Sequence, residues 1–316
     1  MRKIVFYLVL LSLVIISCKK EHGPANSAAT AQKVVFTVGF AQNSQAITNN
    51  NVTVSSLHVN AAPDTSLTNH INIIYYTVFD AAGNQLHNIY QVKGDTSFGH
   101  YTDNLHPGNY TVAISAGTDI GVASGAGDIN GTFIYGPGGV NSSQGFVSDV
   151  FFKRLNITVA NTTLNQNISL NRLTSRLIIN INDAIPANSN YASINISNVA
   201  SRYYVGTDQV INVSGPGNNF GQYDFIIPVS AGGTKNYRIV SDFMYLGDFN
   251  VNIEIGQQSN NSTTVFGSKS VSNVTAAPNK ITLLSGNLFG GSGTNATGGF
   301  QVTTDTTWNP TIVKTF

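Results

Sequence analysis

The chain has 316 residues and a formal net charge of +1, and only 10% of its residues are charged. Such a chain has neither the basic field that attracts nucleic acid nor an acidic field that gathers cations. Its single cysteine excludes internal disulfides and thiolate zinc sites, so burial of apolar residues must stabilise it. The length is sufficient for one large domain or two ordinary ones.

The N-terminus has the composition of a secretory signal peptide. Arg2 and Lys3 precede an apolar run over residues 4–16, which ends at the small residue Ser17. This run is too short to span a bilayer comfortably, so we expect residues 1–17 to be a cleaved signal peptide. A retained N-terminal anchor is the alternative.

The only cysteine follows this run directly. The stretch I-I-S-C resembles the lipobox of bacterial lipoproteins, which implies cleavage between Ser17 and Cys18 and lipidation of Cys18, for example with palmitate. Two or more acyl chains hold a soluble domain on a membrane. Residues 18–32 would then form a lipidated tether, because they are rich in small and polar residues and lack a strand pattern. A buried core cysteine is a poor alternative, since no packable sequence surrounds it.

Beyond the tether, apolar and polar residues alternate with period two in many short segments, and no helical period is sustained. Alternation of this kind predicts strands with one buried face, and turn residues separate them. The sequence therefore predicts an all-β fold of antiparallel β-sandwiches or barrels. The predicted strands cover residues 33–40, 51–59, 70–80, 109–117, 149–159, 166–170, 175–182, 192–199, 223–229, 235–246, 249–256 and 279–286.

Turn residues support this organisation. Gly83 and Asn84 tolerate positive φ between two strands, and Pro107-Gly108 predicts a type II turn. The glycine-rich stretch 117–145 indicates a large surface loop or excursion inside the first half. We expect two strand-rich domains, 33–171 and 172–316.

The two halves share a faint echo that favours two copies of one domain type. "GNYTVAIS" occurs in the first half and "KNYRIVSD" in the second. Each stretch follows a turn, and each continues from a tyrosine into aliphatic alternation.

Catalytic and metal signatures are nearly absent. The chain has two glutamates, Glu21 and Glu254, of which the first lies in the tether, so a paired-glutamate site is excluded. His100, Asp103 and His106 lie close together in sequence but match no metal template, and a solvated loop is the simpler interpretation. The stretch 128–132 resembles a fragment of a calcium loop but lacks further oxygen ligands. We expect no enzyme, metal or cofactor.

Aromatic side chains leave two interpretations open. Exposed rings can stack on sugars, whereas most rings in a sandwich belong to its core or edges. The residues concerned are Tyr75, Tyr76, Tyr90, Tyr101, Tyr203, Tyr204, Tyr245 and the single tryptophan, Trp308.

The whole pattern resembles the fimbrillin-like lipoproteins of Bacteroidetes, specifically the FimB/Mfa2-type anchor or accessory subunits. The features that carry the resemblance are the lipobox, "IIYYTVFDAAGNQL", "NLHPGNYTV", "LNRLTSRLIININDAIP" and the closing "NKITLLSGNLFGGSGT…FQVTTDTTW". It implies two tandem transthyretin-like sandwiches, of Ig-like topology class, behind the lipidated cysteine. It also implies assembly with other fimbrial subunits by exchange or addition of strands.

The position of arginine bears on this resemblance. Shaft subunits of such families lose an N-terminal strand to an arginine-specific protease, but no arginine occurs between Cys18 and Lys153. A cut at Arg154 would destroy the first domain, so we expect the chain to keep its first strand and act as an anchor or accessory. A lysine-specific cut at Lys33 would escape this argument.

Two functions remain open from the sequence. The first is a non-enzymatic, lipid-anchored subunit of a fimbrium at the outer membrane, with host or bacterial surface ligands as further candidate partners. The alternative is a glycan-binding surface lipoprotein of a polysaccharide-uptake system, which low charge and many Tyr and Asn residues favour. A single tryptophan is few for that role.

Overall fold

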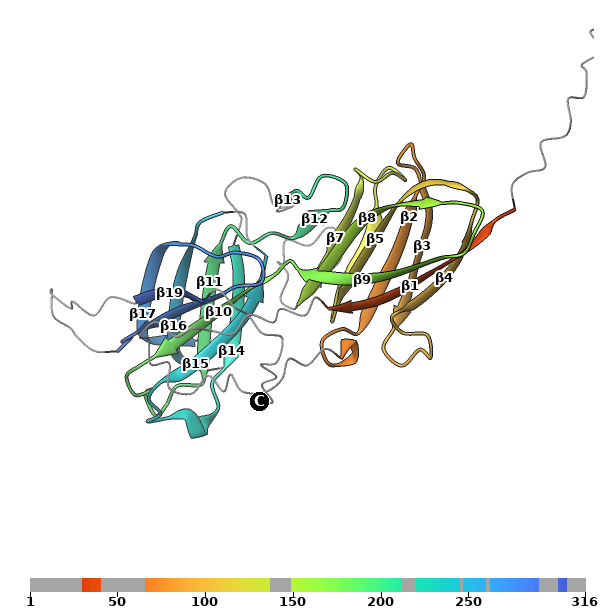
Figure 1. Cartoon of the computed structure of the whole chain (residues 1–316). Helices are drawn as coiled ribbons and strands as arrows, with labels where there is room; N and C mark the ends of the chain where they lie inside the picture. Colours follow the sequence, from red (N-terminus) through yellow and green to blue (C-terminus); the bar gives the residue numbers. More distant parts are fainter. Residues whose placement is uncertain are drawn as a thin grey trace, which may run out of the picture.

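The computed structural model describes residues 30–40, 66–136, 149–211, 220–244, 247–259, 262–289 and 301–305 (Figure 1). Within these ranges the chain is all-β, as the alternation predicts, with strands and two short 3-10 helices. Every predicted strand in these ranges is confirmed, and the one predicted over 51–59 lies outside them. No helix in the described ranges is long and apolar enough to cross a membrane.

The elements, in chain order, are β1 (Gln32–Phe40), η1 (Leu67–Asn69), β2 (Ile73–Phe79), β3 (Gln85–Val92), β4 (His100–Leu105), β5 (Gly108–Gly117), β6 (Gly121–Ser124), β7 (Thr132–Tyr135), β8 (Val150–Val159), β9 (Leu164–Arg172), β10 (Ser175–Ile181), β11 (Tyr191–Ser197), β12 (Arg202–Tyr204), β13 (Val210–Ile211), β14 (Phe220–Ile226), η2 (Val229–Ala231), β15 (Tyr237–Phe243), β16 (Phe249–Ser259), β17 (Ser262–Val274), β18 (Ile281–Gly286) and β19 (Gln301–Asp305).

The first sandwich is one sheet of order β3-β2-β5-β8-β9-β1-β4 that folds over on itself. Its two layers, β3-β2-β5-β8 and β9-β1-β4, are joined where β8 and β9 pair at only two positions. A continuous apolar core fills the space between them, because one face of each strand is apolar. Its large buried members include Phe36, Ile74, Tyr76, Tyr101, Ile114 and Ile168.

Strand β1 lies inside this sandwich rather than at its edge. It pairs in parallel with β9 and antiparallel with β4. Val34, Phe36 and Val38 alternate toward the core and are at most 5% exposed. Full burial of such a side chain stabilises a fold by about 1.5–3 kcal/mol. The alternation of "KVVFTVGF" is therefore the pattern of a core strand.

The second sandwich consists of two four-stranded sheets, β15-β10-β18-β19 and β14-β11-β16-β17. Its core lies between them and includes Leu177, Ile194, Phe243, Phe249, Ile253 and Leu284. Strand β9 ends at Arg172 and β10 begins at Ser175. The division of the chain into domains at residues 171 and 172 stays a prediction.

The same strand order recurs in the two sandwiches. In both, the first strand pairs in parallel with the seventh, β1 with β9 and β10 with β18. Strand β5 therefore corresponds to β16, since each lies between the second and sixth strands of its sandwich. The recurrent order agrees with two copies of one domain type, although "GNYTVAIS" and "KNYRIVSD" fall on β5 and β15, which do not correspond. Tyrosine followed by aliphatic alternation fits many strands, so it does not identify equivalent ones.

The two sandwiches are joined by a small sheet of order β13-β12-β7-β6 (Figure 1). Strands β6 and β7 come from the stretch 117–145, which leaves the first sandwich as the predicted excursion but is strand rather than loop in this part. Apolar side chains in this stretch cover the outer face of the first sandwich. A mixed cluster of buried residues results: Phe79, Ala113, Ile120, Ile134, Val150, Phe152, Ala200, Tyr203, Val205 and Met244.

Two local predictions are also corrected by the structure, and one is confirmed. Gly83 has φ of +88°, as its turn requires. Gly108 does not have positive φ, so the expected type II turn is absent. Instead Gly108 begins β5, and the Tyr110 hydroxyl donates to the His106 carbonyl at 2.8 Å. The predicted solvated loop around His100 is strand β4, because pairing with β1 outweighs the polar composition of the stretch.

Candidate docking edges and groove

The predicted lipidation and cleavage sites cannot be placed. Ser17 and Cys18 lie outside the described residues, as do Tyr245 and Trp308. Anchoring through Cys18 therefore stays a prediction.

The His–Asp cluster does not form a metal site. His100 faces β1, where its Nδ1 lies 3.4 Å from the Thr37 hydroxyl. Asp103 instead pairs with His87, at 2.7 Å from Nδ1 to Oδ2, and accepts from the Tyr76 hydroxyl at 3.3 Å. No group of three metal-binding side chains occurs among the described residues. Asp103 thus links β4 to His87 on β3 and to Tyr76 on β2.

The calcium-like fragment is a turn. The Asp128 carboxylate accepts from the backbone amide of Gly131 at 2.7 Å, and the Asp128 carbonyl accepts from the Thr132 hydroxyl at 2.6 Å. Asp128 thus uses these two oxygens to hold the turn.

Several of these aromatic residues belong to the cores, as expected if most rings in a sandwich lie in its core or at its edges. Tyr76, Tyr101 and Tyr203 are at most 7% exposed, and burial raises the pKa of each phenol. Tyr90 is the exception, with 62% of its surface exposed. Its ring lies 5.6 Å from that of the half-buried Tyr75 on the neighbouring strand.

Strand β3 has an unusual composition for a sheet edge. It is the end strand of the first sandwich's sheet. Six large apolar side chains of the described residues are exposed, and four of them, Leu86, Ile89, Tyr90 and Val92, lie on β3. An open edge that carries apolar residues is a template for pairing with another chain. The sequence could not predict this feature, because an edge position depends on the topology.

Gln91 holds the end of β3 in place. Its Nε2 donates to Ser97 Oγ at 3.0 Å and to the His100 carbonyl at 2.9 Å, and its Oε1 accepts from the Gly99 amide at 2.9 Å. The side chain is 9% exposed. It thus ties β3 to the start of β4 through the loop between them.

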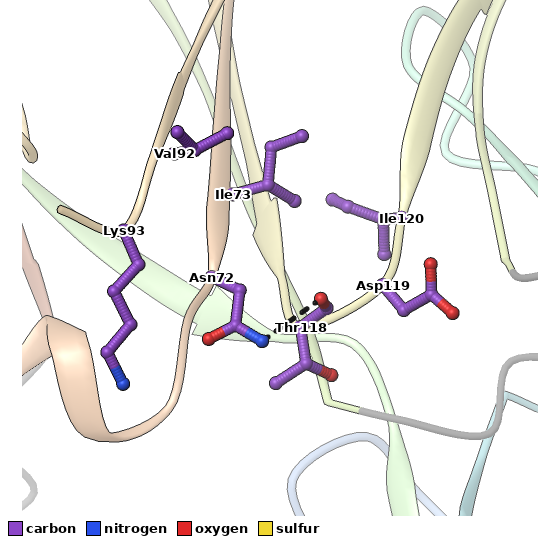
Figure 2. A pocket seen from close by; sticks show the side chains of 7 residues that line it. All are labelled: Asn72, Ile73, Val92, Lys93, Thr118, Asp119 and Ile120. Atoms are coloured by element: carbon purple, nitrogen blue, oxygen red, sulfur yellow. Dashed lines mark hydrogen bonds between the residues drawn. The ribbon is translucent and has the colours of Figure 1, made fainter. Parts of the chain in front are cut away.

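A shallow groove of about 500 Å³ lies beside the C-terminal end of β3 (Figure 2). Ile73, Val92 and Ile120 form its apolar part, and the Asn72 amide donates to the Thr118 carbonyl at 3.3 Å. Lys93 and Asp119 stand on opposite sides of it (Figure 2). Such a lining offers apolar contact, hydrogen bonds and one charge of each sign.

A buried ion pair lies where the two sandwiches meet. Arg172 Nη2 donates to Asp149 Oδ2 at 2.9 Å, and Arg172 Nη1 donates to Asn279 Oδ1 at 3.4 Å. The guanidinium also lies 4.9 Å from the centre of the Phe151 ring. Burial lowers the pKa of Arg172, while Asp149 acts in the opposite direction. The sequence analysis missed this network.

The described residues thus form two β-sandwiches whose polar clusters are used in structural contacts and whose edge strand β3 carries exposed apolar residues. The family model of the fimbrillin-A associated anchor proteins Mfa1 and Mfa2 matches residues 43–265, more than half of the chain. The chain belongs to this family. It is therefore a fimbrial or adhesin-type protein of the cell envelope, from a non-enzymatic family whose members associate with other fimbrial subunits.

Solved structures show the same fold at low sequence identity. The fimbrial anchor protein Mfa2 from Porphyromonas gingivalis is 10% identical with a TM-score of 0.51, and the match covers 87% of this chain and 97% of that one. A candidate cell adhesion protein from Bacteroides eggerthii is 10% identical with a TM-score of 0.50, covering 88% and 97%. A candidate polysaccharide binding protein from Bacteroides thetaiotaomicron is 10% identical with a TM-score of 0.50, covering 81% and 91%. No curated protein matches the chain.

Proposed function

We propose that the chain is a lipid-anchored fimbrial anchor or accessory subunit that keeps its N-terminal strand. Cys18 would carry the lipid at the outer membrane, and residues 18–32 would tether two sandwich domains, 33–171 and 172–316, at the cell surface. Other subunits would join by strand exchange or by addition to an open edge.

The observation that supports this role is the place of β1. It lies between β9 and β4 with its alternate side chains buried, so removing it would open the core of the first sandwich. No arginine occurs from Cys18 to Lys153. Arg154 lies within β8, paired with Ala113 of β5, and its Nη2 donates to Asp208 at 2.8 Å. An arginine-specific protease therefore has no exposed linker at which to release β1.

N-terminal sequencing of the chain purified with its fimbriae tests the retained strand. We expect the assembled protein to start at a blocked Cys18 and to contain β1. An assembled form that starts after Phe40 would contradict the proposal. As a matched comparison, arginine-specific digestion of the native chain should leave residues 18–153 intact.

Lipidation is tested separately by labelling growing cells with a fatty-acid analogue. Cys18→Ala should lose the label and leave the membrane fraction, whereas Lys20→Ala should keep both. A labelled Cys18→Ala chain would contradict anchoring through this residue.

Glycan binding is the second candidate, and Tyr90 favours it. An exposed ring suits the apolar face of a sugar, and Tyr90 lies on the same strand as Val92, which lines a groove with an amide, a hydroxyl and a carboxylate. The polysaccharide-binding description of the Bacteroides thetaiotaomicron structure agrees with this candidate. Affinity electrophoresis on a polysaccharide panel tests it. A retardation that Tyr90→Ala abolishes and Val265→Ala preserves would support it, whereas equal mobility on every polysaccharide would contradict it.

A further inference from the structure

The backbone of β3 has a short stretch of outward-facing hydrogen-bonding groups. The Lys93 amide donates to the Asn72 carbonyl at 2.7 Å, so the backbone amide of Lys93 faces the side of β2. The Val92 amide donates to the Asp95 carboxylate at 2.8 Å, and the Val92 carbonyl accepts from the Asp95 amide at 3.0 Å. Both backbone groups of Val92 therefore face away from β2. These directions alternate along an antiparallel strand. Asn88 and Tyr90 therefore also direct their amide and carbonyl groups away from β2.

Contacts within the chain occupy both ends of this edge. At one end the Val92 amide and carbonyl bond to Asp95, and at the other the Gln85 amide donates to the Gly127 carbonyl at 2.8 Å. The register between β2 and β3 shifts between His87 and Gln85, so the regular alternation covers only residues 87–92. Within it, Asn88 and Tyr90 are the residues whose outward-facing backbone groups are not used by the turn at Asp95. No described strand pairs with this side of β3.

Beta-sheet edges are usually protected by charged residues, and β3 has no such protection. Its sequence, QLHNIYQV, contains no Asp, Glu, Lys or Arg. The end strand β17 of the second sandwich, by contrast, carries Lys269. The edge of β3 can therefore accept an uncharged strand.

We propose that the β3 strands of two copies of this chain pair antiparallel about a two-fold axis through Ile89. In this register Asn88 of one copy lies opposite Tyr90 of the other. The residues with outward-facing groups thus meet each other and exchange about four hydrogen bonds. This self-association goes beyond the association with other fimbrial subunits.

The side chains of β3 match the same register. Ile89, which is 47% exposed, faces Ile89 of the second copy across the axis. A two-fold contact applies one patch to itself, so a charge on β3 would meet a like charge, and β3 has none. Pairing covers both open edges at once, which leaves no further β3 edge for a third copy.

The contact is small, because the free part of the edge is short. Standard stable interfaces bury about 1,200–2,000 Å² in total, and one short strand pair provides less. We therefore expect a weak dimer that is best detected by cross-linking. On the axis, Cα atoms of facing residues lie about 4.5 Å apart, within the range that a disulfide bridges.

Disulfide cross-linking of the full chain in detergent tests the pairing. Ile89→Cys should form a cross-linked dimer under mild oxidation, several-fold above Val265→Cys, whose site on β17 is 46% exposed. The parent chain measures the background from Cys18. A mixture of Asn88→Cys and Tyr90→Cys copies should cross-link more than either alone, which tests the register independently. Adding Tyr90→Lys to Ile89→Cys should reduce the dimer.

Three outcomes would overturn the proposal. Ile89→Cys could cross-link no more than Val265→Cys, with circular dichroism showing both folded. The Asn88→Cys and Tyr90→Cys mixture could show no excess over the single variants. Ile89→Cys could instead cross-link to a different protein, which would mean that a strand of another subunit occupies the edge.

Discussion

Arg172 and Asp149 form an ion pair whose side chains are 4% and 13% exposed, with 2.9 Å between Nη2 and Oδ2. Asp149 immediately precedes β8, and Arg172 ends β9. The Thr174 hydroxyl also donates to this carboxylate, at 3.2 Å, and the Asn279 amide donates to the Thr174 carbonyl at 2.9 Å. Through Thr174 and Asn279, the pair therefore connects the last strand of the first sandwich to a loop of the second.

Arg172→Met should lower the free energy of unfolding by about 3–5 kcal/mol, because it leaves the Asp149 carboxylate buried without its partner. Urea denaturation measures the change. The double variant Asp149→Asn, Arg172→Met should recover part of the loss. Arg154→Met removes a more exposed pair, 30% and 52% exposed, and should cost about 1 kcal/mol or less. Equal losses for the two arginines would contradict the role of burial.

Gln91→Leu should destabilise the first sandwich by about 1–3 kcal/mol, because the Gly99 amide loses its acceptor in a buried position. Thermal unfolding measures the effect. Tyr90→Leu alters the adjacent, exposed side chain and should change stability by less than about 0.5 kcal/mol. If Gln91→Leu unfolds at the parent's temperature, Gln91 does not hold the loop.

Gly256→Ala should destabilise the second sandwich by about 1–3 kcal/mol through overpacking. A Cβ at Gly256 would collide with the backbone carbonyl of Thr264 on the neighbouring strand. Gly39→Ala is the matched control, since a Cβ there meets nothing within 4 Å. Denaturation midpoints of the two variants should separate clearly, and equal midpoints would contradict the packing at β16 and β17.

The chain should lose stability as the pH rises above about 10, the ordinary pKa of tyrosine. Burial raises the pKa of Tyr76, Tyr101 and Tyr203 in the folded state. Above that pH the unfolded chain ionises these phenols and the folded chain keeps them neutral. Ionisation therefore stabilises the unfolded state relative to the folded state. Stability from this source is complete below pH 10 and falls above it.

A spectrophotometric titration of the phenols, followed together with circular dichroism, measures this dependence. Some of the 13 tyrosines should ionise only with unfolding. Tyr101→Phe should lessen the alkaline loss. Complete ionisation of all tyrosines without a change in circular dichroism would contradict the burial of these side chains.

Alternation predicted the strands whose inner face is strictly apolar. Strand β16 shows this best, with Phe249, Val251, Ile253 and Ile255 all at most 1% exposed. Its neighbour β17 is long but consists largely of Ser, Thr and exposed residues, so its sequence has no apolar period. It is a strand because β16 offers it a ladder of hydrogen bonds, which only the folded partner supplies.

The candidate surfaces were less predictable than the fold. The apolar residues of β3 look in sequence like those of any half-buried strand, and only the sheet order shows that nothing described covers them. Asp149 and Arg172 are far apart in sequence and carry no motif. Family membership was predictable from the strand–turn patterns, and the family model matches residues 43–265.

The parallel pairing of the first and seventh strands also constrains the order of folding. Val34 pairs with Leu164 in the first sandwich, and Arg176 pairs with Ile281 in the second. Contacts between residues this distant form late and slowly, because a long loop must close first. During synthesis, β1 must therefore remain unpaired on its β9 side until nearly the whole first sandwich has left the ribosome. The early chain is consequently the stage at which a chaperone that shields apolar segments would have the greatest effect on yield.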